Sequence, residues 1–256
     1  MYKSTLLTGG TAQAQPCPPT VTPAAASGAG ALRAALGSTA ANGTICFGPT
    51  FSTPQTITLA SGLSITRSLT ISGTGIDDLV LNGNNAYRVI SVTAGVDVTL
   101  KNLTVRNGMV ANNTGAGIYS RGALTLTNVA VFSNTAGTST SALGGGLYVS
   151  GTLTMEGGRV ERNRAARGGG MYVNAGAAAL TGVGVYRKTA VNPDRGGGVV
   201  APYDAPFPDD PFTGGARALP ALVPTSLDAP ASADNIAAWE VLTAFDRPFL
   251  TAFSDG

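Results

Sequence analysis

Apolar and polar residues alternate in short runs over most of the first 200 residues. Four segments repeat the pattern in order: "GAGIYSRGALTLTNVAVFSN", "GGGLYVSGTLTMEGGRVERN", "GGGMYVNAGAAALTGVGVYR" and "GGGVV". The glycine before the apolar pair falls at Gly117, Gly146, Gly170 and Gly198, at steps of 29, 24 and 28 residues. A less regular copy, "RVISVTAGVDVTLKNLTVRNG", occupies residues 88–108. Repetition with a period in the twenties is typical of stacked structural repeats.

Within each copy the polar residues between apolar ones are mainly Thr, Ser and Asn. This period-two pattern predicts strands of about 3 to 5 residues with one buried face, separated by glycine. One turn cannot bury its apolar face alone, but stacked turns can, because each strand pairs with its equivalent in the next turn. The buried positions are expected to recur from copy to copy, at Val98, Leu100, Leu103 and Val105, then Leu124, Leu126, Val129 and Val131, then Leu153, Met155 and Val160, then Leu180, Val183 and Val185.

The corners between strands carry Gly triplets and Asn. The triplets suit tight corners where a positive φ is required. Asn107, Asn134 and Asn163 fall at corners that match in the alignment of the copies. Two interpretations stay open for these residues, a hydrogen-bonded ladder between coils or ordinary turn residues.

The repeats resemble those of right-handed parallel β-helices in bacterial surface and secreted proteins. Upstream, "ALRAALGSTAANGTICFGPTFSTPQTITLASGLSITRSLTISGTG" resembles the N-terminal cap and first coils of such proteins. The resemblance implies that "LRAAL" is a short amphipathic helix covering the open end. Its inward residues would be Ala31, Leu32, Ala35 and Leu36. The expected fold is all-β, a right-handed parallel β-helix over residues 28–198, preceded by a tail or leader-like segment at 1–27.

Composition changes abruptly near residue 199. Residues 1–198 carry 14 Lys and Arg against 6 Asp and Glu, whereas residues 199–256 carry 2 against 8. The last 58 residues also hold 8 of the 15 prolines, which would interrupt a parallel ladder. The basic residues are scattered, with no basic run or interleaved aromatics, so a nucleic-acid partner is not expected. No apolar run reaches the roughly 20 residues of a membrane-spanning helix.

The segment 199–256 resembles an internal piece of haloalkane dehalogenases, which are α/β-hydrolases. The residues that carry the likeness are "YDAPFPD", "GARALPALVPTS" and "AAWEVLTAFDRPFLTAFSDG". The resemblance implies a loop, a helix and a strand, with Pro206 at a halide pocket and Phe207 beside it. The nucleophile elbow and the His base of that family have no counterpart here, and its catalytic acid is expected just past Gly256. We interpret the chain as a chimera, joined between about residues 198 and 201.

The absence of His from all 256 residues removes much chemistry. No Ser-His-Asp or Cys-His relay can be built from this chain, and a zinc site is not expected. We predict no cofactor and no metal. Cys17 and Cys46 could form one disulfide, as a secreted setting favours, or both be free, as a cytosolic one favours.

One charged cluster stands out on the predicted coils. Glu156, Arg159, Glu161 and Arg162 fall within a single copy of the repeat. Such a cluster is more typical of surface ion pairs than of catalysis, although contact with a carbohydrate stays open. The favoured function is a non-catalytic scaffold, secreted or at the bacterial surface and of adhesin or passenger type. The alternatives are a hydrolase identified through the dehalogenase-like segment, and a polysaccharide lyase or glycosidase on the β-helix.

Overall fold

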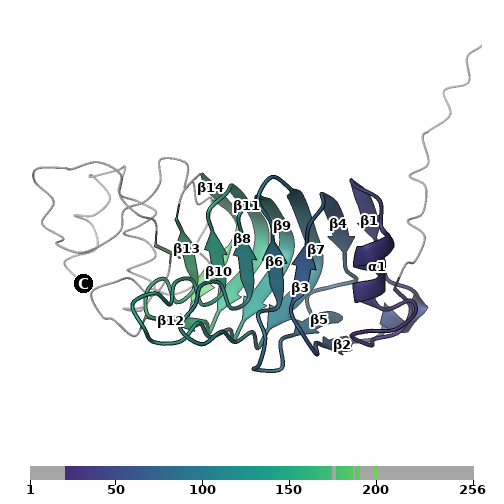
Figure 1. Cartoon of the computed structure of the whole chain (residues 1–256), viewed down its shortest axis with the longest axis horizontal. Helices are drawn as coiled ribbons and strands as arrows, with labels where there is room; N and C mark the ends of the chain where they lie inside the picture. The colour runs from purple at the N-terminus through teal and green to yellow at the C-terminus, as the bar shows by residue number, and fades with distance from the viewer. Residues whose placement is uncertain (1–20, 175–176, 187, 191–198, 201–256) are drawn as a thin grey trace, which may run out of the picture.

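The alternating segments form short strands that stack side by side along one axis. This computed structural model describes residues 21–174, 177–186, 188–190 and 199–200. They form a parallel β-solenoid of about six turns, capped at one end by a helix (Figure 1). The predicted stacked coil is therefore confirmed. Fourteen strand pairings are parallel, including those of the long central strands.

Three sheets run along the described part of the solenoid. The largest contains β1 (Gly43–Ile45), β4 (Leu69–Ser72), β7 (Asp97–Arg106), β9 (Ala123–Phe132), β11 (Leu153–Glu161) and β14 (Ala178–Thr181), joined by β2 (Gln55–Thr58), β5 (Leu79–Asn82) and β15 (Gly184–Tyr186). The second contains β3 (Leu63–Ile65), β6 (Ile90–Val92), β8 (Ile118–Ser120), β10 (Leu147–Val149), β13 (Met171–Val173) and β17 (Val199–Val200). The smallest pairs β12 (Arg164–Ala165) with β16 (Thr189–Ala190).

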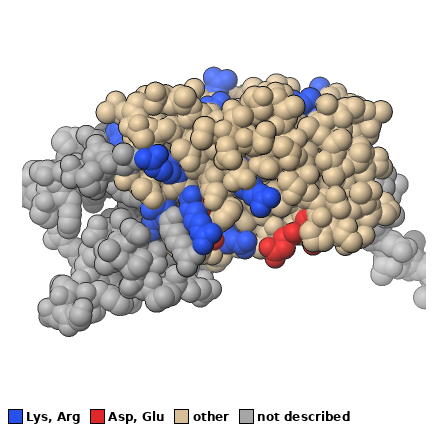
Figure 2. Space-filling view, turned by 90° about the horizontal axis from the view of Figure 1, so that it is seen from below, with Lys and Arg blue, Asp and Glu red and all other residues tan. Residues whose placement is uncertain are grey.

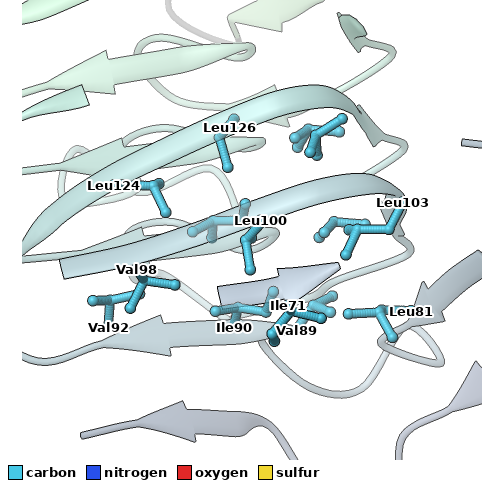
Figure 3. Close-up of a cluster of buried hydrophobic side chains, with 14 of the residues drawn as sticks. Ile71, Leu81, Val89, Ile90, Val92, Val98, Leu100, Leu103, Leu124 and Leu126 are labelled. Atoms are coloured by element: carbon cyan, nitrogen blue, oxygen red, sulfur yellow. The ribbon is translucent and has the colours of Figure 1, made fainter. Parts of the chain in front are cut away.

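The core is built from columns of equivalent apolar residues. Leu100, Leu126, Met155 and Leu180 are consecutive partners across β7, β9, β11 and β14. All are buried, and Figure 3 shows Leu100 and Leu126 in successive coils of the cluster that fills the interior. Every apolar position expected to face inward is buried, so the period-two prediction is confirmed. Stacking equivalent residues lets each coil remove apolar surface from water on both neighbours.

The N-terminal end of the core is closed by α1 (Leu32–Ser38). Leu32, Ala35 and Leu36 are buried in the main apolar cluster, and Ala31 at the N-cap is also buried. Arg33 on the same helix donates hydrogen bonds to the carbonyls of Ser61 and Gly62, 28 and 29 residues later. The predicted cap is thus confirmed. A 3-10 turn, η1 (Pro49–Ser52), adds the buried ring of Phe51.

Strands β7, β9 and β11 are longer than the sequence predicts, at 10, 10 and 9 residues. Each continues through a bend with positive φ, at Asn102 (49°) in β7, at Asn128 (50°) in β9, and at both Gly157 (64°) and Gly158 (80°) in β11. The side-chain amide of Asn128 donates to the Oδ1 of Asn102 at 3.0 Å. The expectation of 3 to 5 residues was wrong here because Asn in β7 and β9, and Gly in β11, adopt the left-handed region without ending the ladder.

The predicted ladder of corner asparagines forms in part. The Nδ2 of Asn134 donates to the Oδ1 of Asn163 at 2.9 Å, and both residues are fully buried. Asn107 does not join them, because its coil places Gly108 at the ladder position. The backbone N–H of Gly108 donates to the Oδ1 of Asn134 at 2.7 Å, and Asn107 instead donates to Asn82 at 3.2 Å. Alignment of Asn107 with the other two was therefore wrong by one residue.

The Gly triplets form the corners before the second sheet. Gly144 and Gly168, the first glycines of their triplets, have φ of 61° and 57°, which confirms the expected positive φ. Gly146, a third glycine, is needed for another reason, since an added Cβ would lie 2.5 Å from the Gly170 carbonyl oxygen and 2.8 Å from the Nδ2 of Asn163. The fourth repeat also begins as a coil, because Val199 of β17 pairs with Met171 of β13.

Candidate functional site

The charged cluster expected near β11 forms in part. The Nε of Arg159 lies 3.8 Å from one carboxylate oxygen of Glu161, and the Nε of Arg162 lies 3.4 Å from the other. Asp77 joins from a different coil, with its Oδ1 3.8 Å from Arg159. Glu156 is exposed before the bend of β11 and has no ion pair within the described residues. The structure brings three of the four predicted residues together and leaves Glu156 apart.

The geometry of this cluster is that of a surface ion-pair network. Its three contacts are longer than the 2.7–2.9 Å of strong charge-assisted hydrogen bonds. The side chain of Asp77 is 83% exposed and that of Arg162 is 51% exposed, so water screens much of the attraction. Figure 2 looks at the solenoid from below and shows several Lys and Arg side chains gathered there, with few carboxylates among them.

The largest sheet carries an outward row of threonines. Thr44, Thr70, Thr99, Thr125 and Thr154 are consecutive partners from β1 to β11, and Ala179 follows in β14. None of them is buried. β-Branched residues stacked in this way suit a half-exposed pleated surface. The row gives this face a strip of hydroxyl groups, one from each coil.

The second sheet carries a stack of tyrosines outside the main apolar cluster, of which Tyr172 is buried at 6% exposure. Tyr119, Tyr148 and Tyr172 are consecutive partners in β8, β10 and β13. Their ring centroids lie 5.3 and 5.8 Å apart, with interplanar angles of 11° and 3°. Burial raises the pKa of Tyr148 above its ordinary value, and the phenol groups of Tyr119 and Tyr172 add to the effect. The sequence shows this stack as "GIY", "GLY" and "GMY" at equivalent positions.

Arg88 lies beside the first ring of this stack, two residues before the start of β6. Its guanidinium carbon lies 4.8 Å from the centroid of Tyr119, in cation–π distance. Its Nε and Nη2 donate to the carbonyls of Gly115 and Thr114 at 2.9 and 2.8 Å. Burial lowers the pKa of Arg88 from its ordinary value, while Tyr119 acts in the opposite direction. None of the three ion pairs among the described residues involves Arg88.

A groove of about 540 Å³ opens next to Arg88. Tyr87, Met109 and the hydroxyl-bearing Ser64 and Ser91 contribute to its lining. Tyr87 and Met109 are 38% and 40% exposed, and they are the large apolar side chains that the described part of the chain leaves exposed. The backbone N–H of Met109 donates to the carbonyl of Tyr87 at 3.0 Å, which fixes the two loops side by side. The sequence repeat did not reveal this groove, because Tyr87, Arg88 and Met109 in its lining lie outside the alternating strands.

Three predicted site residues lie outside the residues that the structure describes. They are Pro206 and Phe207 of the dehalogenase-like segment, and Cys17. Cys46 is buried at 8% exposure, next to β1. Because Cys17 lies outside the described residues, the Cys17–Cys46 disulfide stays a prediction. Within the described ranges, no helix has the length and apolar character to span a membrane, and no group of three metal-ligating side chains occurs.

Comparison with known proteins matches a short part of the chain. Haloalkane dehalogenase 1 of Mycobacterium bovis is 61% identical over 56 residues, which is 22% of this chain and 19% of the relative. Haloalkane dehalogenases of Mycobacterium marinum and Psychrobacter cryohalolentis are 54% and 51% identical over 57 residues, again 19% of each relative. The resemblance to haloalkane dehalogenases is confirmed for this fraction of the chain.

The chain thus spans about a fifth of the length of the curated relatives it matches. No known family profile matches the chain, and no solved structure matches it either. The fold and surface define the class of protein as a parallel β-solenoid with hydroxyl and aromatic rows on its outer faces. To this is added a short likeness to the haloalkane dehalogenases.

Proposed function

We propose that this chain is a non-catalytic β-solenoid scaffold, secreted or associated with the bacterial surface and of adhesin or passenger type. The observation that carries the proposal is the outward row from Thr44 to Thr154, one hydroxyl per coil. A regular row of this kind suits lateral contact with an extended partner. The ion pairs that hold Glu161 between two arginines support the same view, since such pairs are typical of a solvated surface.

The location can be tested on intact cells that express the tagged chain. We expect externally added protease to remove the tag from intact cells, while a cytoplasmic marker protein survives. Recovery of the chain in the culture medium would equally support the proposal. Full protection of the tag in intact cells, with cleavage after lysis, would contradict it.

The same proposal divides the chain into a tail at 1–27, a solenoid at 28–198 and a dehalogenase-like segment at 199–256. The change in charge and proline content near residue 199 supports this division. Limited proteolysis followed by mass spectrometry tests it. Cleavage at 199–215 with a resistant N-terminal core is expected, and initial cleavage between strands of the solenoid would contradict it.

A second candidate function is dehalogenation, favoured by the similarity to named haloalkane dehalogenases. Against it, the chain contains no His in 256 residues to serve as the base, and sequence resembling β-helix stands where the nucleophile elbow would lie. Release of bromide from a bromoalkane measures this directly. Turnover above a buffer blank would favour the enzyme, and none is expected.

A third candidate is cleavage of a polysaccharide at the cluster on β11. The proximity of Glu161 to Arg159 and Arg162 is the observation in its favour. The test is incubation with acidic and neutral polysaccharides, followed by analysis of reducing ends. Activity that Glu161→Gln or Glu156→Gln abolishes would support this function, and we expect no cleavage.

A further inference from the structure

The groove beside Arg88 combines features that a ligand site needs and a plain loop surface lacks. The exposed large apolar side chains of the described residues, Tyr87 and Met109, both line it. Exposed apolar groups that converge on one concavity mark a binding surface more than isolated ones do. The hydroxyl groups of Ser64 and Ser91 and the amide of Asn113 also line the groove and supply polar contacts.

The charge of the groove is positive. Arg88 is the charged residue of its lining, and no Asp or Glu contributes to that lining. Two carbonyls and the Tyr119 ring orient the guanidinium, and its Nη1 lies 3.5 Å from the Ser91 hydroxyl. An arginine has five N–H donors in a planar fork, so these contacts leave donors for a carboxylate. Orientation of the fork before binding lowers the entropy cost of forming such a contact.

Two residues that line the groove, Ser64 and Ser91, also belong to the outward row of the second sheet. Ser64 and Ser91 are partners in β3 and β6, and Ser91 is the partner of Tyr119, which begins the tyrosine stack. Polar and aromatic groups therefore recur once per coil along the solenoid axis, about 4.8 Å apart. This repeat suits an extended ligand with a hydroxyl-rich repeating unit more than a compact one.

We propose that the groove lined by Tyr87, Arg88 and Met109 binds an acidic oligosaccharide, with a sugar ring against the exposed side chains and a uronate carboxylate on Arg88. The proposal deepens the non-catalytic role and rests on it in one respect, namely that the saccharide is bound and not cleaved. Ser64, Ser91 and Asn113 would contact sugar hydroxyls, and further units would extend over the half-buried Tyr119 and Tyr148.

The test is calorimetric titration of the full chain with two matched hexasaccharides. One is a cello-oligosaccharide, and the other is its C6-oxidised counterpart, which carries a carboxylate on each ring. We expect the oxidised form to bind at least about tenfold more tightly at low salt. Raising the ionic strength from about 0.05 M to about 0.5 M should remove most of that preference. Equal affinity for both forms, or binding of neither at millimolar concentration, would overturn the proposal.

Variants localise the binding. Tyr87→Ala changes an exposed side chain and should weaken binding about tenfold without altering the urea midpoint. Arg88→Gln should remove the preference for the oxidised form. Lys101→Gln is the matched control, because Lys101 is an exposed cation in β7 on the other sheet. Unchanged affinity in Tyr87→Ala and Arg88→Gln, or an equal loss in Lys101→Gln, would contradict the site. Saccharide cleavage products in the calorimeter cell would overturn the non-catalytic role but not the proposal that the groove binds the saccharide. Absence of binding would overturn the binding proposal but not the non-catalytic role.

Discussion

Replacement of Asn134 by Ala should destabilise the solenoid strongly. The Oδ1 of Asn134 accepts the N–H of Gly108 at 2.7 Å, and its Nδ2 donates to Asn163 at 2.9 Å and to the Val105 carbonyl at 3.3 Å. Asn134 is fully buried, so no water replaces these contacts. Its backbone φ is not in the left-handed region, and Ala therefore introduces no backbone strain.

The magnitude follows from the groups left without partners. A buried donor or acceptor that loses its partner costs about 1–3 kcal/mol. Gly108 loses the acceptor of its N–H, while the Oδ1 of Asn163 keeps the backbone N–H of Asn134 at 2.9 Å. One fully stranded donor and two weakened acceptors together give about 2–4 kcal/mol in the free energy of unfolding.

The assay is urea unfolding followed by circular dichroism, with Asn128→Gly as the matched control. Asn128 also donates to the asparagine of the preceding coil, but it is exposed, and Gly keeps its positive φ. We expect the control to lose under about 1 kcal/mol. The reasoning would be refuted if the free energy of unfolding of the Asn134→Ala variant lay within about 0.5 kcal/mol of the wild-type value, with the same dependence on urea concentration. A double-mutant cycle with Asn163→Ala should show coupling of about 0.5–3 kcal/mol.

Three further changes probe other contacts. Gly117→Ala should destabilise the chain by about 1–3 kcal/mol in urea unfolding, since an added Cβ would lie 2.5 Å from the Gly146 carbonyl oxygen; Gly37→Ala, where the added Cβ meets nothing within 4 Å, is its control. Leu126→Ala should cost about 2–5 kcal/mol because its side chain is fully buried, and a loss under about 1 kcal/mol would contradict its place in the core. The pKa of Tyr148 is higher in the folded state than in the unfolded state, where it is about 10. Its contribution to the free energy of unfolding is therefore fully present below about pH 10 and declines as pH rises through the folded pKa. Tyr148→Phe should therefore lose less stability between pH 9 and 11 than the wild type, and identical losses would contradict the shift.

The sequence predicts the solenoid well because the buried columns depend on local alternation. Each of Val98, Leu100, Leu103 and Val105 is buried as expected, with partners at equivalent positions in the next coil. The corner ladder was predicted less well, since Asn107 follows Val105 by two residues, whereas Asn134 and Asn163 follow their valines by three. Counting from the valine column would have shown that Gly108 takes that position.

The candidate site was harder to predict for a physical reason. Tyr119 and its two partners repeat visibly in the sequence, but Arg88, Tyr87 and Met109 lie in loops. Their proximity depends on the register between coils, which brings residues more than 20 positions apart into contact. The charged cluster was predictable where its members lie on one strand, whereas the partnership with Asp77 was not.

The connection between β9 and β10 contributes Ala136 and Ala142 to a separate cluster of small side chains outside the main core, which also contains Ala116, Ala165 and Ala166, with Val110 against it. Coil length varies between 24 and 29 residues. The loops on the side of this alanine cluster accommodate the variation, because the stacked strands keep their register. Thr138, Thr140 and Ser141 are exposed at the tip of the longest excursion. A foreign peptide inserted there would be displayed away from the stacked strands, which makes this loop a suitable site for epitope insertion.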